Sequence, residues 1–286
     1  MRLLVTGATG LVASRIVPIA RARGHVVVAQ SRATHGELWR PEIVDALFAA
    51  SVPDVIIHPA GLTDVDACER SPDEAYRSNM LATRNLAGAA RRTGAHLIYV
   101  STDYVFDGER GPYSENDLPN PQGVYARTKF QAELVARTFV PSCAIVRTAT
   151  VMGWPPGAKN NFGAWLVKSM SSGESVRLFS DQIVSPSLAS NVAEMVIDVA
   201  EARGAGVWNL CGADAVDRVS VGRKVCEVFG FDQALIQPVK MAEGALSVLR
   251  PLRAGLTVGR AARLAHPPMS LEEIVRGLRA EWRREG

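Results

Sequence analysis

The chain has 286 residues, of which 47% are hydrophobic and 21% charged, and its formal net charge is +3. This length fits one large domain or two modest ones with a sizeable core. The small net charge and the lack of dense Lys/Arg blocks before residue 240 argue against a nucleic-acid partner. The Arg-rich end, from Arg276 to Arg284, is typical of the solvated face of a terminal helix.

Four scattered cysteines without CxxC spacing predict reduced thiols, and neither a disulfide framework nor a zinc site. The opening run MRLLVTGATG lacks the features of a signal peptide. No apolar run approaches the roughly 20 residues needed to span a bilayer. We therefore expect a cytoplasmic protein with no membrane partner and no bound metal.

Short β-branched runs alternate with longer helical patterns along the first 150 residues. The patterns predict strands over Leu3–Thr6, His25–Ala29, Asp54–His58, His96–Ser101 and Ala144–Arg147, and helices over Leu11–Arg23, Ile43–Ala50, Pro72–Thr93 and Val124–Thr138. Such alternation is typical of an α/β fold, with a doubly wound parallel sheet of the Rossmann type wrapped by helices.

After residue 150 the alternation loosens. Helices are expected over Asn161–Ser172 and Ser190–Glu201, strands over Val176–Phe179 and Val207–Leu210, and short proline-broken elements from Cys211 to Pro268. We predict a dinucleotide-binding domain over residues 1–150 and mainly a substrate-binding lobe over 151–286. Some elements of the lobe, about 176–210, are expected to return to the first domain. The loop Asp107–Gln122 is too long for a mere connector, and we expect it to shape the substrate pocket with this lobe.

The first chemical signal is TGATGLVA, from Thr6 to Ala13, between a predicted strand and a predicted helix. Gly7 lets the chain turn sharply, and Gly10 lets a pyrophosphate approach the backbone at the helix N-terminus. A turn that merely needs glycine is the alternative. The predicted cofactor contacts here are Gly7, Thr9, Gly10, Leu11 and Val12.

The second strand ends in Ala29-Gln30-Ser31-Arg32, without the acidic residue that usually binds the ribose 2′-hydroxyl of NAD. Ser31 and Arg32 can instead hold a 2′-phosphate through charge-assisted hydrogen bonds. This pattern favours NADP(H), with NAD(H) as the other possibility.

Tyr125 and Lys129 form a YxxxK pair, and residues four apart share one face of a helix. A neighbouring ammonium is expected to lower the pKa of the phenol, which is otherwise about 10 and too high for acid–base catalysis near neutrality. Ser101 and Thr102 follow the fourth strand at the edge where such sheets bind ligands, so Thr102 can orient a carbonyl towards Tyr125.

These motifs resemble the extended short-chain dehydrogenase/reductases, and most of all the dTDP-4-dehydrorhamnose reductase group. The resemblance rests on STDYVFDG (Ser101–Gly108) and PYSENDLPNPQGVYARTK (ending at Lys129). It extends over nearly the whole chain, through AYRSNMLATRNLAGAA (Ala75–Ala90), IVRTATVMG (Ile145–Gly153), NNFGAWL (Asn160–Leu166), DQIVSPS (Asp181–Ser187) and LRPLRAGL (Leu249–Leu256).

The resemblance implies a catalytic triad of Thr102, Tyr125 and Lys129. It implies further cofactor contacts from Ala60, Gly61, Asn79 and Ser101 in addition to Tyr125 and Lys129. It also implies contacts with a nucleotide-sugar substrate from Asp64, Val65, Thr102, Tyr104, Phe106, Asn161 and Arg250.

Three positions depart from the pattern of the family. His58-Pro59-Ala60-Gly61 replaces the usual Asn-Ala-Ala run, and Pro59 has no N–H to offer the cofactor. The acidic residue expected after the second strand comes only as Glu37. Arg15 stands where some members carry a glutamate for a shared magnesium ion, so we expect no metal-linked dimer, and the chain is a monomer or a homodimer.

The resemblance and the motifs together predict NADPH-dependent reduction of a keto group on a nucleotide-linked sugar. Two alternatives stay open: a sugar-nucleotide epimerase or dehydratase with bound NAD, and a non-catalytic NADP-binding regulatory subunit.

Overall fold

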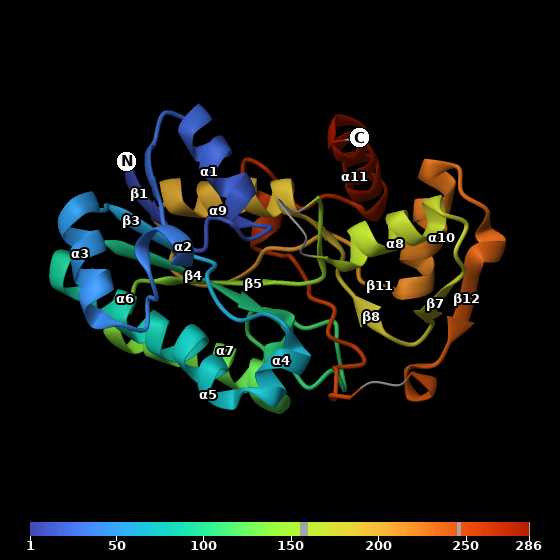
Figure 1. Cartoon of the computed structure of the whole chain (residues 1–286), viewed down its shortest axis with the longest axis horizontal. Coiled ribbons are helices and arrows are strands. Elements are labelled where there is room, and N and C mark those ends of the chain that lie inside the picture. The colour runs from blue at the N-terminus through green and yellow to red at the C-terminus, as the bar shows by residue number, and fades with distance from the viewer. Residues whose placement is uncertain (155–159, 245–246, 286) are drawn as a thin grey trace.

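The computed structural model describes residues 1–154, 160–244 and 247–285. A sheet with helices on both faces occupies the left of Figure 1, and a smaller lobe of helices and short strands occupies the right.

Six strands form one sheet, and every neighbouring pair in it is parallel. In spatial order they are β2 (Val26–Ala29), β1 (Arg2–Val5), β3 (Val55–His58), β4 (His96–Thr102), β5 (Ala144–Thr148) and β10 (Gly206–Asn209). Every residue of β3 and β4 is buried, as expected for strands covered on both faces. The predicted α/β fold with a parallel sheet is confirmed.

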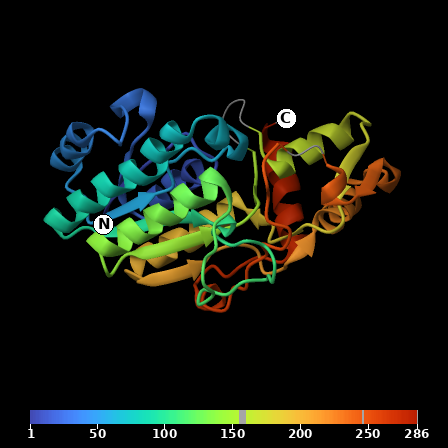
Figure 2. The same ribbon diagram turned by 90° about the horizontal axis from the view of Figure 1, so that it is seen from below.

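Helices cover the two faces of the sheet in separate layers (Figures 1 and 2). One face carries α1 (Ala13–Ala22) and α9 (Ala189–Glu201), and the other carries α3 (Pro41–Ser51), α6 (Ala82–Thr93) and α7 (Gly123–Phe139). Because α1 and α3 lie on opposite faces, the winding reverses between β1 and β3. A ligand-binding crevice is expected at such a reversal, outside the carboxyl ends of the strands.

The predicted helix Pro72–Thr93 is present but not uniform. It begins as α5 (Pro72–Ala75), widens into a π-helical turn over Tyr76–Leu81 and continues as α6. Such wide turns are frequent at functional sites, and this one contains Asn79. Two short helices were not expected, α2 (Arg32–His35) and α4 (Val65–Arg70).

The lobe has a hydrophobic core of its own. It is built from α8 (Phe162–Ser171), α10 (Arg218–Phe229), α11 (Leu271–Glu285) and the paired strands β7 (Val176–Phe179) and β12 (Ile236–Val239). Short strands join it to the sheet, where β6 (Val151–Met152) pairs with β9 (Ser187–Leu188) and β8 (Ile183–Val184) with β11 (Val216–Asp217).

The expectation of only short elements between Cys211 and Pro268 is wrong, because α10 runs for 12 residues. Asp217 caps its start by accepting a hydrogen bond from the Ser220 N–H, and Gly230 ends it in the left-handed conformation. The prolines lie outside this helix.

The segment predicted to return to the first domain divides between the two parts of the molecule. Strand β7 pairs with β12 inside the lobe, whereas α9 packs on α1 and β10 extends the main sheet. These pairings support a return from residue 189 onward, and the domain boundary near residue 150 stays a prediction.

The loop Asp107–Gln122 does not line the pocket described below, so its expected role there is wrong. Tyr113 is hydrogen-bonded through its backbone to Gly255 (2.7 Å) and Thr257 (2.8 Å), and its ring stacks on Phe106 with centroids 4.2 Å apart. The loop packs against the chain segment that follows residue 250 and has a structural role.

Arg15 connects α1 to the lobe, as it donates to the Trp154 carbonyl (2.8 Å) and to Glu281 on α11 (3.1 Å).

The helices in the described part of the chain include none with the length and apolar character that a membrane span requires.

Candidate active site

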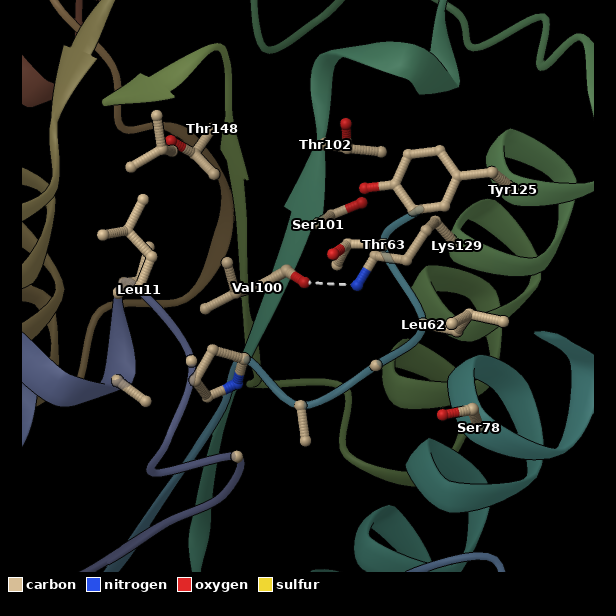
Figure 3. A pocket seen from close by; sticks show the side chains of 18 of the residues that line it. Leu11, Leu62, Thr63, Ser78, Val100, Ser101, Thr102, Tyr125, Lys129 and Thr148 are labelled. Carbon is tan, nitrogen blue, oxygen red and sulfur yellow. Dashed lines mark hydrogen bonds between the residues drawn. The ribbon is translucent and has the colours of Figure 1, made fainter. Parts of the chain in front are cut away.

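One pocket lies at the carboxyl ends of the strands, with one wall from the sheet and the other from the lobe. Figure 3 shows part of it, with side chains from α7, β4 and the loops around them. The predicted residues that line this pocket are Gly7, Thr9, Gly10, Leu11, Val12, Arg32, Ala60, Gly61, Val65, Ser101, Thr102, Tyr104, Tyr125, Lys129 and Asn161.

The turn after β1 has the shape that a pyrophosphate requires. Gly7 has a φ of +62°, and a Cβ on it would come within 2.9 Å of the Ala60 Cα, so only glycine fits. Helix α1 starts behind this turn at Val12 without a side-chain cap and without an acidic residue in its first turn. Ser14 and Arg15 donate their N–H groups to carbonyls of the turn, whereas no partner among the described residues binds the N–H groups of residues 11–13. These N–H groups are left for an anion, and the residues present fit a dinucleotide.

His58, which begins the run that replaces the usual Asn-Ala-Ala of the family, holds the start of this turn through Thr6. Its Nδ1 lies 2.7 Å from the Thr6 hydroxyl and its Nε2 lies 3.1 Å from the Thr83 hydroxyl. The Ala60 N–H donates to the same Thr6 hydroxyl (3.4 Å). Burial, with a smaller effect of Lys129, lowers the pKa of His58 to about 3, so the ring is neutral.

Asn79 lies behind the pocket wall and does not line it. Its side-chain amide donates to the Leu62 carbonyl (3.1 Å) and to the Thr128 hydroxyl (3.0 Å), and its oxygen accepts from the Leu62 N–H (2.8 Å). A Cβ at Gly61 would lie 2.6 Å from that oxygen. Asn79 thus joins the loop after β3 to α7, and we expect its effect on the cofactor to act through this loop.

Tyr125 and Lys129 both point from α7 into the pocket, one helical turn apart (Figure 3). The Lys129 ammonium donates to the Val100 carbonyl (2.7 Å) and lies 4.3 Å from the centre of the Tyr99 ring. Burial lowers the pKa of Lys129 to about 7, against an opposing effect of Glu133.

The expected lowering of the Tyr125 pKa by Lys129 is not found. Burial raises the pKa of the phenol, a hydrogen bond with Thr102 opposes that rise, and Lys129 is not among the leading causes. Desolvation disfavours the charged form of both groups, so it raises the pKa of the phenol and lowers that of the amine. Tyr125 is therefore a protonated group, suited to donate its proton.

Thr102 ends β4 beside Tyr125. Its hydroxyl donates to Asp103 (3.0 Å) and accepts from the Tyr104 N–H (3.2 Å). Burial raises the pKa of Asp103 to about 7 against several hydrogen bonds. The Tyr104 ring meets the Tyr125 ring edge-on, with centroids 5.7 Å apart.

A buried ion pair lies behind these groups, on the same face of α7 as Tyr125 and Lys129. Glu133 binds Arg147 of β5 through two hydrogen bonds (3.0 and 2.8 Å) and accepts a third from Ser101 (2.5 Å). The Glu133 and Arg147 side chains are only 2% and 3% exposed. This triangle ties α7 to β4 and β5 and so sets the position of the catalytic helix against the strand ends.

The two residues expected at a 2′-phosphate differ in their surroundings. Ser31 is buried and caps α2, where its hydroxyl accepts from the Thr34 N–H and lies 2.8 Å from the Thr34 hydroxyl. Arg32 lines the pocket with its side chain 74% exposed, 3.6 Å from Glu37. Arg32 is free to reorient towards a phosphate, whereas Ser31 is held by the cap.

Three predicted substrate residues lie outside the pocket wall. Asp64 caps α4 through the Ala67 N–H (2.8 Å), and Arg250 forms an ion pair with Asp66 (2.7 Å). Phe106 is 1% exposed because its ring stacks on Tyr113 in a separate hydrophobic cluster.

The sequence interpretation missed several residues that line the pocket. Trp39 follows α2 and lies 5.1 Å from Arg40 and 5.6 Å from Arg77, measured from its ring centre. Thr148 ends β5 with a buried hydroxyl for which the described part of the chain offers no hydrogen-bond partner. Phe162 and Arg218 come from α8 and α10 of the lobe. The aromatic side chain after the second strand could have suggested Trp39 as a pocket residue. Nothing in the neighbouring sequence indicated that Thr148, Phe162 or Arg218 would line the pocket.

A Rossmann sheet with a glycine turn after β1, and a tyrosine and a lysine on one helix face beside β4, define an extended short-chain dehydrogenase/reductase. The chain matches the model of a family described as the RmlD substrate binding domain over residues 1–279. The protein therefore belongs to this family of NAD(P)-dependent oxidoreductases.

Relatives in this family match along most of the chain. This chain is 33% identical over 296 residues to the probable low-salt glycan biosynthesis reductase Agl14 of Haloferax volcanii, and the match covers 99% of this chain and 98% of the relative. It is 34% identical over 248 residues to a dTDP-4-dehydrorhamnose reductase of Mycobacterium tuberculosis, covering 85% and 80%.

Two solved structures show related enzymes with cofactors. The dTDP-4-dehydrorhamnose reductase of Bacillus anthracis in complex with NADP superposes with a TM-score of 0.90 at 25% identity, over 98% of this chain and 99% of that one. MoeE5 in complex with UDP-glucuronic acid and NAD superposes with a TM-score of 0.83 at 26% identity, over 100% of both chains.

Proposed function

We propose that this protein uses NADPH to reduce a keto group on a nucleotide-linked sugar. The observation that carries the proposal is that Thr102, Tyr125 and Lys129 face one pocket whose adjoining wall is the uncapped, glycine-lined start of α1. Relatives named dTDP-4-dehydrorhamnose reductase support this reaction class over an epimerase or a dehydratase.

The cofactor in this proposal is NADP(H), held by the Gly7–Val12 turn and by Arg32 at its 2′-phosphate. The NADP complex of the Bacillus anthracis reductase supports this choice. NAD(H) is the second candidate, because MoeE5 was solved with NAD and Arg32 is exposed enough to turn away. The bound dinucleotide supplies a hydride for the carbonyl carbon.

The chain's own residues bind the carbonyl and supply the proton. The Thr102 hydroxyl orients the substrate oxygen, and the Tyr125 hydroxyl donates its proton to that oxygen as the carbon gains the hydride. The proton comes from a phenol kept neutral by burial, so no ionisation has to precede the step. Lys129, one helical turn further along α7 on the same pocket wall, contacts the cofactor in this proposal.

The direct test is the absorbance of NADPH in the presence of a nucleotide-linked 4-ketosugar. The expected result is a fall that needs both protein and ketosugar and matches the alcohol formed mole for mole. Purified protein that holds stoichiometric NAD and interconverts sugars without net NADPH loss would instead be an epimerase or a dehydratase. Protein that binds NADPH, co-purifies with another enzyme and reduces no ketone would be a regulatory subunit.

The remaining parts of the proposal concern substrate contacts, location and assembly. Val65, Tyr104 and Asn161 line the pocket and are proposed to contact the sugar nucleotide. Four free, buried cysteines suit a reducing compartment, which supports a cytoplasmic location. We propose a monomer or a homodimer whose pocket is complete within one chain.

A further inference from the structure

Arg218 is a cationic side chain that the lobe contributes to the pocket wall. It is the first residue of α10 and is partly buried. The neighbouring carboxylate, Asp217, caps α10 by accepting from the Ser220 N–H and hydroxyl (2.9 and 2.6 Å), and it forms no ion pair with Arg218.

The Arg218 guanidinium is held from two sides. Its Nε donates to the Gln182 side-chain oxygen (2.5 Å), and its plane lies over the Phe162 ring at 4.3 Å from the centre. Gln182 is itself buried and donates to the Pro251 carbonyl (3.3 Å). These contacts leave the two terminal nitrogens of Arg218 without a hydrogen-bond partner among the described residues.

The positive charge of Arg218 also lacks a neutralising partner. No described carboxylate forms an ion pair with it, while Asp103 and Tyr104 favour its charged form and Arg250 opposes it. Asp103 offers little compensation, since burial raises its pKa to about 7. A desolvated cation without a counter-ion is costly, so an anionic ligand at this position would relieve the cost.

Arg250, which the family resemblance placed at the nucleotide-sugar substrate, is in the opposite situation. It forms an ion pair with Asp66 (2.7 Å), and Asp66 is also bound by Ser247 (2.8 Å). It does not line the pocket. Asp66 balances its charge, although Arg250 also lies close enough to Tyr104 and Arg218 to act on both.

We propose that Arg218, and not Arg250, binds a phosphate of the substrate's nucleoside diphosphate. The inference rests on the proposed function. It places the substrate anion on the lobe wall beside Tyr104, away from the glycine turn and Arg32, which serve the phosphates of the cofactor. The guanidinium fork suits two phosphate oxygens.

Calorimetric titration of the full chain with dTDP and UDP, and with thymidine and uridine as probes lacking the phosphates, tests the inference. Wild type is expected to bind at least one diphosphate at least ~10-fold tighter than its nucleoside. Arg218→Gln should weaken the binding of that diphosphate by roughly 10- to 100-fold, because charged hydrogen bonds are lost, and should leave NADPH affinity unchanged. Arg250→Gln, the matched control, should change diphosphate affinity by less than about 3-fold, since its charge is balanced elsewhere.

Arg218→Lys keeps the charge but not the fork, so an affinity between wild type and Arg218→Gln supports the inference, and it carries the test if Arg218→Gln does not fold. The role of Arg218 is overturned if both Arg218 variants bind the diphosphate as tightly as wild type does. It is also overturned if they lose as much affinity for NADPH as for the diphosphate. If wild-type protein binds neither diphosphate while binding NADPH, the proposed substrate class itself is wrong, which is a different result from a failure confined to Arg218.

Discussion

The two walls of the pocket differ in how their polar groups are satisfied. On the sheet wall, Lys129 is bonded to the Val100 carbonyl, Thr102 to Asp103, and Ser101 to a buried ion pair. On the lobe wall, Arg218 has one side-chain hydrogen bond, to Gln182, and no ion-pair partner among the residues that the structure describes. The sheet wall is organised by contacts within the protein, whereas we propose that a ligand completes the lobe wall.

This contrast separates chemistry from recognition. Groups that transfer a proton have to be held in one geometry, which the sheet and α7 provide through buried hydrogen bonds. A group that recognises an anion gains affinity when the protein does not neutralise it in advance. Changes on the sheet wall should therefore affect kcat, folding or cofactor affinity, and changes on the lobe wall should affect substrate affinity.

The largest effect is expected for Tyr125→Phe, which removes the proton donor. We predict a fall in kcat of about 10²- to 10⁴-fold with NADPH affinity unchanged, since the ring still packs on Tyr104. Steady-state kinetics and NADPH titration measure both. Tyr76→Phe, at a tyrosine that is 39% exposed, is the control and should keep full activity. Near-normal turnover in Tyr125→Phe would exclude the proposed role of this tyrosine.

Glu133→Gln tests the buried Glu133–Arg147 ion pair behind the sheet wall. It leaves Arg147 buried without its counter-charge, so we expect a loss of about 3–5 kcal/mol in the free energy of unfolding. Chemical denaturation measures it. Asp45→Asn, which breaks an exposed pair with Arg92, should cost less than about 1 kcal/mol. Combining Glu133→Gln with Arg147→Met should recover part of the loss, and equal costs for the buried and exposed pairs would contradict this account.

Gly7→Ala tests the pyrophosphate turn. The added Cβ would meet Ala60 at 2.9 Å and strain a φ of +62°, so the turn has to shift. We expect NADPH affinity to fall by at least ~10-fold, a cost of about 1.4 kcal/mol or more. Gly24→Ala carries similar backbone strain (φ +80°) with open space around it, and it should leave NADPH affinity unchanged. Equal effects of the two would point to backbone strain alone.

The neutral His58 beneath that turn should make the fold sensitive to acid. Its pKa is about 3 in the folded state and 6.5 in the reference state, so the unfolded chain binds more protons between these values. Stability is then lost as pH falls below 6.5, by about 2 kcal/mol at pH 5. His58→Gln should flatten this dependence in denaturation measured from pH 7 to pH 5, and His35→Gln at an exposed position should not. An unchanged slope in His58→Gln would contradict a buried neutral imidazole.

The smallest effect is expected at the exposed Arg32. Arg32→Ser should weaken NADPH by about 10-fold and leave NADH nearly unchanged, because only NADPH has the 2′-phosphate. The ratio of the two dissociation constants measures it, with Arg84→Ser as an exposed control for net charge. A ratio that does not change would assign the cofactor preference to other residues.

Much of the sheet wall could be predicted from local sequence. The glycine turn, the YxxxK pair and Thr102 each depend on a few neighbouring residues, because a strand followed by a helix places them at one edge of the sheet. The Tyr125 pKa could not be predicted this way. The direction of the pKa shift depends on how deeply α7 is buried against β4, and sequence spacing alone suggested the opposite direction.

The chain's sequence by itself determined the α/β class, the family and the residues that carry the chemistry, because those follow from periodicity and from motifs held within a few residues. Only the tertiary structure decided that Phe106 and the loop Asp107–Gln122 pack away from the pocket and that Arg250 is already paired. It also decided that Arg218 reaches the pocket wall without an ion-pair partner among the described residues. Charge balance depends on which distant segments meet in space, and no local pattern along the chain records that.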